Sequence, residues 1–173
     1  SMIALLKYGS GLPFNRIEKL QNGLGIPLPA TTQWDLVHAA AKKVMPAFDE
    51  LVREAAQGKV LHNDDTSMKV LELLGERRVD PLDDEPEERT GVFTTGIVST
   101  RDEHLIALFL TGREHAGENL KEVLAHRAAE LPPPIQMSDA LSRNAPGDTP
   151  TLKANCNSHG RRYFVNVVED FPE

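Results

Sequence analysis

The stretch VLHNDDTSMKVL, residues 60–71, places two adjacent carboxylates, Asp64 and Asp65, between two apolar runs. Its first residues, with the preceding lysine, read KVLHND and predict a short strand that ends at Asp64. An aspartate at a strand end is commonly a turn residue or a helix cap. The pattern therefore predicts a carboxylate at the C-terminal end of a strand and leaves open whether it is structural or functional.

Further strands and helices follow this first strand. GVFTTGIVST is rich in β-branched and aromatic residues, and HLIALFLTG is a nearly continuous apolar run, so both are predicted to be strands. The tight polar connection at 101–103 predicts that they form a hairpin. The remaining predicted elements are a helix at 118–131, a short strand within 132–141 that ends at Asp139, a strand at 152–156 and a helix at 159–171. This order predicts a mixed α/β sheet covered by helices.

The segment before the sheet, residues 13–57, is predicted to be helical. From Trp34 to Val52 its apolar residues keep helical spacing, and Pro46 within this run is expected to kink the helix or to begin a new one. Two helices joined by a turn are also typical of a helix-turn-helix, although the second has few basic side chains near its start. Two hypotheses follow: DNA contact by this segment, or a helical hairpin that packs on the next domain.

Composition sets the class of protein. The chain has 173 residues, 40% hydrophobic and 26% charged, as expected for one domain or one domain with a small appendage. It shows no apolar run long enough to span a membrane and no signal-peptide pattern. The single cysteine, Cys156, excludes an internal disulfide framework and favours a reducing cytoplasm.

The net charge of −7 argues against nucleic acid as a partner when it is taken alone. However, residues 80–88, DPLDDEPEE, hold six acids and no bases. A run of this kind is usually a solvated loop, and its two prolines discourage regular structure. Most of the negative charge is therefore expected to lie in one loop, so nucleic acid is not excluded for the rest of the chain.

Asp64 and Asp139 are the candidate metal ligands. Two aspartates from different strands of one sheet can meet at one edge, where their hard oxygens suit Mg²⁺ or Mn²⁺. A pair of such ions about 4 Å apart promotes phosphodiester displacement. The alternative is that each aspartate is only a turn or cap residue.

Two other polar motifs have both a functional and a structural interpretation. Cys156 and His159 have the spacing of half a zinc site, but no second pair follows. Arg161 and Arg162 at a helix start would suit phosphate contacts, or would simply be solvated. In TGREHAGENL, residues 111–120, Arg113 could contact a backbone phosphate, or Glu118 could cap its helix.

Four separated motifs resemble the insertion-sequence 66 family of bacterial transposases. HNDDT is similar to the signature around the family's first catalytic aspartate, and TGREHAGENL, RAAELPPPIQMSDALSRN and ANCNSHGRRYFVNVVEDFP follow in the family's order and spacing. The resemblance implies a ribonuclease-H-like catalytic core with an Asp-Asp-Glu metal site, preceded by a helical segment. It identifies Asp64 as the first catalytic aspartate and Asp139 as the second. Asp65 stands where the family usually has Glu, and is expected to point away from the metal or to support Asp64.

The third acid of that site has no counterpart that we can place. Glu169, Asp170 and Glu173 match no third-acid motif, so we expect a piece of a longer transposase: a helical segment at 1–57 and a catalytic core at 58–173, truncated before the third acid. We expect little or no strand transfer from this piece.

The resemblance implies DNA cleavage and strand transfer at insertion-sequence ends, with Mg²⁺ or Mn²⁺ as cofactor. It implies DNA as partner, contacted by Arg113, Arg161 and Arg162, and a homo-oligomer in the full-length protein. Two alternatives remain: a ribonuclease-H-like nuclease without strand transfer, and a non-catalytic DNA-binding or assembly module.

Overall fold

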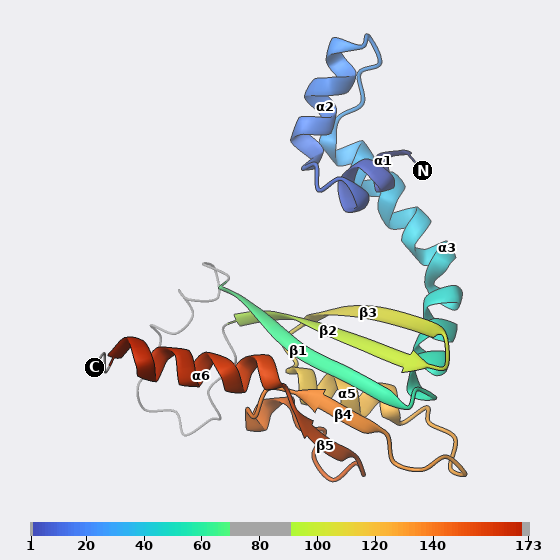
Figure 1. The fold of residues 1–173 in the computed structure, drawn as a ribbon. Coiled ribbons are helices and arrows are strands. Elements are labelled where there is room, and N and C mark those ends of the chain that lie inside the picture. The colour runs from blue at the N-terminus through green and yellow to red at the C-terminus, as the bar shows by residue number, and fades with distance from the viewer. Residues whose placement is uncertain (1, 70–90, 171–173) are drawn as a thin grey trace, which may run out of the picture. The chain divides into compact units, whose positions relative to one another are not determined.

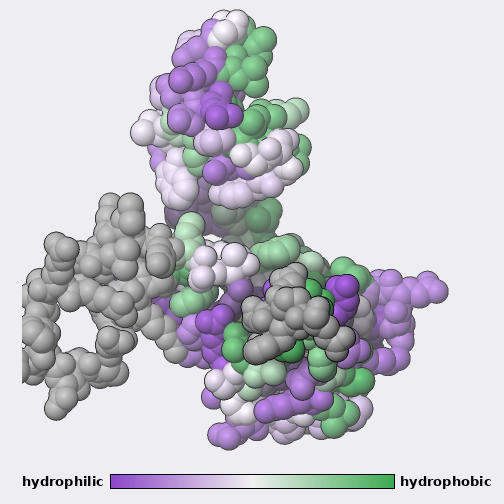
Figure 2. All heavy atoms as spheres, turned by 60° about the vertical axis from the view of Figure 1, so that its left-hand side comes forward, coloured by the Kyte–Doolittle hydropathy of each residue, from purple (hydrophilic) through white to green (hydrophobic). Residues whose placement is uncertain are grey.

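The computed structural model describes residues 2–69 and 91–170, and the chain divides into two compact units, residues 1–50 and 51–173. The acidic run at 80–88, predicted to be a solvated loop, lies outside the described residues. Figure 2 shows hydrophobic residues at the surface of each unit.

The first unit is helical. It contains α1 (Met2–Ala4), the π-helical turn η1 (Leu5–Gly9), α2 (Phe14–Gly23) and most of α3 (Ala30–Ala56), whose last residues belong to the second unit. The ring of Phe14 meets that of Trp34 edge-on at 6.1 Å, and buried Gln33 donates to the carbonyl of Leu28 at 2.8 Å. The ring contact joins α2 to the start of α3, and the hydrogen bond joins α3 to the connection that precedes it. Because α3 continues through Pro46, the expectation that a new helix begins there is wrong.

The second unit is built on a five-stranded mixed sheet (Figure 1). The strands are β1 (Val60–Lys69), β2 (Gly91–Arg101), β3 (His104–Gly112), β4 (Ile135–Ser138) and β5 (Leu152–Asn155), and their order across the sheet is β3-β2-β1-β4-β5. The first three strands are antiparallel, whereas β4 runs parallel to β1 and β5 runs parallel to β4. This confirms the predicted mixed sheet and is consistent with the ribonuclease-H-like fold that the resemblance implied.

The strand β1 is longer than predicted. It pairs with β2 without interruption from Val60, opposite Thr100, to Lys69, opposite Gly91. Asp64 therefore lies in the middle of β1, and the expectation that it ends a strand is wrong. The polar residues that followed Asp64 in sequence suggested a turn, but backbone pairing with β2 keeps them extended.

The helix α5 (Ala116–Leu124) covers one face of the sheet (Figure 1). The core between them contains the fully buried residues Leu61, Ile97, Leu108, Leu120 and Val123. The helix ends earlier than the predicted residue 131. The guanidinium of Arg127 turns back to donate to the carbonyls of Ala56 at 2.6 Å and Gly58 at 2.8 Å, so this residue ties the connection to β4 against the end of α3.

Two further elements complete the unit. A 3₁₀ turn, η2 (Ser142–Asn144), follows β4, and α6 (Asn157–Asp170) follows β5. Gly117 of α5 lies against η2: a methyl group built there would be 2.7 Å from the carbonyl oxygen of Arg143 and closer still to the carbonyl oxygen of Ala145. Because glycine has no side chain, the helix and the turn can approach this closely.

Candidate metal site on the open face of the sheet

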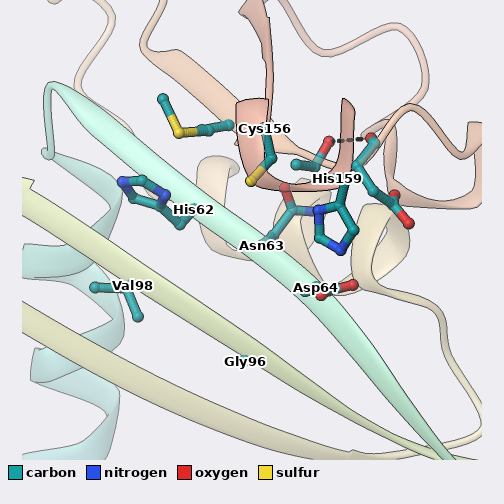
Figure 3. Close-up of a pocket in the computed structure, with 10 residues that line it drawn as sticks. His62, Asn63, Asp64, Gly96, Val98, Cys156 and His159 are labelled. Atoms are coloured by element: carbon teal, nitrogen blue, oxygen red, sulfur yellow. Dashed lines mark hydrogen bonds between the residues drawn. The ribbon is translucent and has the colours of Figure 1, made fainter. Parts of the chain in front are cut away.

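A pocket of about 310 Å³ lies on the sheet near the start of α6 (Figure 3). Its lining residues come from β1, β2, β4 and the segment around the start of α6: His62, Asn63, Asp64, Gly96, Val98, Met137, Ser138, Asp139, Cys156 and His159. Both predicted aspartates line it, and so do the two residues of the Cys-x-x-His motif. Segments that are far apart in sequence thus contribute their polar side chains to one cavity.

The parallel pairing of β1 with β4 explains how the two aspartates come together. His62 is paired with Met137, and two residues further along each chain lie Asp64 and Asp139. Adjacent strands are about 4.8 Å apart, and Asp139 directly follows the last residue of β4, Ser138. The pairing therefore brings the two aspartates to the same region of the sheet, where both line the pocket. The antiparallel neighbour of Asp64 on β2 is Gly96, which has no side chain to cover the carboxylate.

The Asp139 carboxylate is held by the turn that follows it. Its Oδ1 accepts the backbone N–H of Leu141 at 3.2 Å and the side-chain amide of Asn144. Asn144 is fully buried. The acid is therefore attached to η2 as well as to the end of β4.

Asp65 points to the opposite face of the sheet, as expected. Its side chain is 1% exposed, and it accepts hydrogen bonds from the hydroxyl of Thr95 at 2.7 Å and the backbone N–H of Ala116 at 2.9 Å. The carboxylate oxygen that accepts the N–H of Ala116, Oδ2 of Asp65, also lies 3.2 Å from the ring Nδ1 of His115. Asp65 thus joins β1 to β2 and to the first residues of α5, where the N-terminal end of a helix favours a negative charge.

The loop TGREHAGENL serves this attachment. Glu118 accepts the backbone N–H of His115 at 2.7 Å, so its capping role is confirmed. Asn119 donates to the hydroxyl of Thr95 at 2.8 Å, which extends the contacts of Asp65. Arg113 is exposed between β3 and α5, and its phosphate contact stays a prediction.

Cys156 links β4 to α6. Its backbone N–H donates to the carbonyl of Ser138 at 2.9 Å, and its own carbonyl accepts the N–H of His159 at 3.1 Å. Hydrogen bonds from the backbone and side chain of His159, and then from the backbone of Ser158, lower the pKa of the Cys156 thiol to about 7. A thiol at the start of a helix is a typical place for such a shift.

This pKa predicts the pH dependence of thiol reactivity. Because the thiolate is the nucleophile, alkylation of Cys156 by iodoacetamide is expected to rise with pH through a midpoint near 7. His159→Ala should move the midpoint upward, because it removes the side-chain hydrogen bond. The measurement is the alkylation rate from pH 5 to 10 by mass spectrometry. A wild-type midpoint at the ordinary value of about 8.5 would contradict this prediction.

The described residues contain no group of three or more His, Cys, Asp and Glu side chains placed to hold a metal ion. The pocket therefore offers Asp64 and Asp139 as a pair rather than a complete ligand set, and the half zinc motif gains no further ligands from that part of the chain. The imidazole Nδ1 of His159 is buried without a hydrogen-bond partner among the described residues.

Arg161 and Arg162 lie in the second turn of α6 rather than at its start, because the helix begins at Asn157. Both side chains are exposed. An exposed position is compatible with phosphate contact and with simple solvation, so their role stays a prediction.

Three buried side-chain amides, which no sequence motif pointed to, also lie in this unit: Asn63, Gln136 and Asn144. Asn63 and Gln136 occupy buried positions on their strands. An available signal was that Asn63 and Gln136 fall within predicted strands, where a polar side chain that faces the core needs a hydrogen-bond partner.

Comparison with known proteins gives a family. A search of curated proteins and a search of solved structures found no match. No helix in residues 2–69 and 91–170 is long and apolar enough to cross a membrane. The family model described as "Transposase IS66 family" matches residues 1–172, which confirms the resemblance seen in the four motifs. Because the match spans essentially the whole sequence, the chain belongs to the IS66 family of transposases.

Proposed function

We propose that this chain supplies Asp64 and Asp139 to a metal-dependent site that cleaves and joins DNA at the ends of an insertion sequence. The observation that carries the proposal is that both aspartates line one pocket, Asp64 from β1 and Asp139 from the residue that follows β4. Family membership gives the reaction class.

The described residues supply part of a ligand set for a hard divalent cation. Asp64 and Asp139 offer carboxylate oxygens, the ligands that Mg²⁺ and Mn²⁺ prefer, and they would hold the cation. When bound, it would activate the attacking oxygen and stabilise the leaving oxygen of the phosphodiester. Asp64 is exposed on an open strand face beside Gly96, which leaves room for a DNA backbone to approach it.

The other proposed contacts are electrostatic. Arg113, Arg161 and Arg162 are exposed and would bind phosphates, to which a guanidinium can donate two parallel hydrogen bonds. We propose residues 1–57 as the helical segment before the catalytic domain and residues 58–173 as the front of that domain. The full-length parent would be the active enzyme, as a homo-oligomer, and would add the third acid.

Metal titration tests the proposal. We expect the wild-type chain to bind Mn²⁺, and we expect Asp64→Asn and Asp139→Asn each to weaken binding by more than about 100-fold, since loss of a direct ligand exceeds the 10–100-fold effect of outer-shell changes. Electron paramagnetic resonance of free Mn²⁺ measures the affinity.

Asp148→Asn is the control, because Asp148 is an exposed aspartate of the same unit outside the pocket. Equal affinities in all four proteins would refute the site. Salt-sensitive DNA binding that persists in Asp64→Asn, without any metal binding, would favour the non-catalytic DNA-binding module instead.

A further inference from the structure

A buried amide cluster, Asn63, Gln136 and Asn144, lies directly behind the two aspartates. The three residues are 2%, 3% and 0% exposed, and they come from β1, β4 and η2. Asn63 is the neighbour of Asp64 along β1, and Asn144 contacts Asp139. The cluster therefore contacts the carboxylate of Asp139 and adjoins Asp64 along β1.

The backbone of Asn144 is fixed by β1, which carries Asp64, and by β4, which directly precedes Asp139. Its carbonyl oxygen accepts the side-chain amide of Asn63 at 2.9 Å and that of Gln136 at 2.7 Å. The amide of Gln136 also donates to Oδ1 of Asn63 at 3.0 Å. A buried amide left without a hydrogen-bond partner destabilises the folded protein. These bonds therefore strongly restrict where Asn144 can lie.

The side chain of Asn144 extends this restriction to Asp139. Its Nδ2 donates to Oδ1 of Asp139, the same oxygen that accepts the N–H of Leu141. The reverse orientation of the amide would set its oxygen against the carboxylate oxygen, so the donor nitrogen faces Asp139. The Oδ1 of Asn144 is buried without a hydrogen-bond partner among the described residues. Within that part of the chain, the side chain of Asn144 therefore makes its hydrogen bond to Asp139.

From these contacts we infer that Asn144 is a positioning residue, which orients the carboxylate of Asp139 and fixes its place relative to Asp64. For the metal itself this inference rests on the proposed function. The orientation of Asp139 does not, since it follows from hydrogen bonds present without any cation. An outer-shell residue of this kind usually changes metal affinity by about 10–100-fold when it is replaced.

The test replaces Asn144 by leucine, which has a similar shape and no donor. Two quantities are measured on the whole chain: Mn²⁺ affinity, and hydrogen exchange at the N–H of Leu141 by NMR. We expect Asn144→Leu to weaken Mn²⁺ binding about 10–100-fold and to speed exchange at Leu141 about tenfold, since the freed carboxylate no longer holds that N–H.

Thr151→Val is the matched control. It removes the 3.2 Å hydrogen bond from Thr151 to Oε1 of Gln136, at the end of the same network that is remote from Asp139. A merely structural role would make the two variants alike. We expect Thr151→Val to leave both measurements within about twofold of wild type, well below the effect of an outer-shell change.

The outcomes separate the two proposals. Unchanged exchange at Leu141 in folded Asn144→Leu overturns the positioning role. Faster exchange in a chain whose wild type binds no Mn²⁺ supports it, while the metal site fails. If Asn144→Leu does not fold, the wild-type side-chain amide resonances decide. Mg²⁺ or Mn²⁺ should perturb the amide of Asn144 more than that of exposed Asn166, and equal responses in a chain that binds the metal overturn the inference.

Discussion

Asp65→Ala is expected to lower the free energy of unfolding by about 3–5 kcal/mol, the usual cost of removing one member of a buried charged and hydrogen-bonded group. The carboxylate is 1% exposed. Without it, the hydroxyl of Thr95, the N–H of Ala116 and the ring of His115 lose an acceptor. Each buried donor left alone costs about 1–3 kcal/mol, and α5 also loses the negative charge at its start.

Urea denaturation followed by circular dichroism measures this change. The control is Asp64→Ala, the same substitution one residue earlier on the exposed face. It removes the acceptor of a local 2.8 Å contact with the N–H of Asp65, so we expect an effect within about 0.5 kcal/mol, as for most surface substitutions. Equal losses of stability in the two variants would contradict the division of roles between these neighbours.

This pair explains why the chain carries two adjacent acids. Successive side chains of a strand point to opposite faces, so one strand can present Asp64 to a pocket and Asp65 to the core. Asp65 anchors α5 to the middle of β1, and the anchored strand then holds Asp64. The two acids are chemically alike, and the differences in their surroundings give them different roles.

Sequence patterns predicted the strands whose signal is local. The apolar run at 104–112 coincides with β3, and the β-branched run at 91–100 falls short of β2 by one residue. The full length of β1 was not predictable, because its polar second half is held by pairing with β2 rather than by its own propensity. The end of α5 was missed for a similar reason, since Arg127 bonds to residues near Gly58 that are distant in sequence.

The candidate site was predictable in part. Motif resemblance selected Asp64 and Asp139, but their proximity depends on the parallel register of β1 and β4, which no local pattern encodes. The amide of Asn144 was not recognisable as a partner of Asp139 because its burial arises from contacts with both strands. Long-range hydrogen bonds of this kind are visible only when the fold is assembled.

Gly117→Ala is expected to destabilise the second unit by about 2–3 kcal/mol, the upper part of the range for overpacking. Helix propensity alone predicts the opposite sign, since alanine is favoured over glycine in helices by about 1 kcal/mol. The added methyl group would lie 2.7 Å from the carbonyl oxygen of Arg143 and closer to that of Ala145. These are backbone atoms, and the cluster bonds of Asn144 between them restrict how far they can retreat.

Gly160→Ala in α6 is the matched control. Nothing lies within 4 Å of the position its methyl group would take, so propensity should act alone and this variant should be stabilised by up to about 1 kcal/mol. Urea denaturation of both variants measures the difference. Gly117→Ala as stable as wild type would mean that α5 and η2 do not lie in contact. The variant can instead be destabilised and also bind Mn²⁺ more weakly. In that case the contact that packs the helix also positions Asn144, and through it Asp139, because a shift of η2 would move Asn144 and the carboxylate bonded to it.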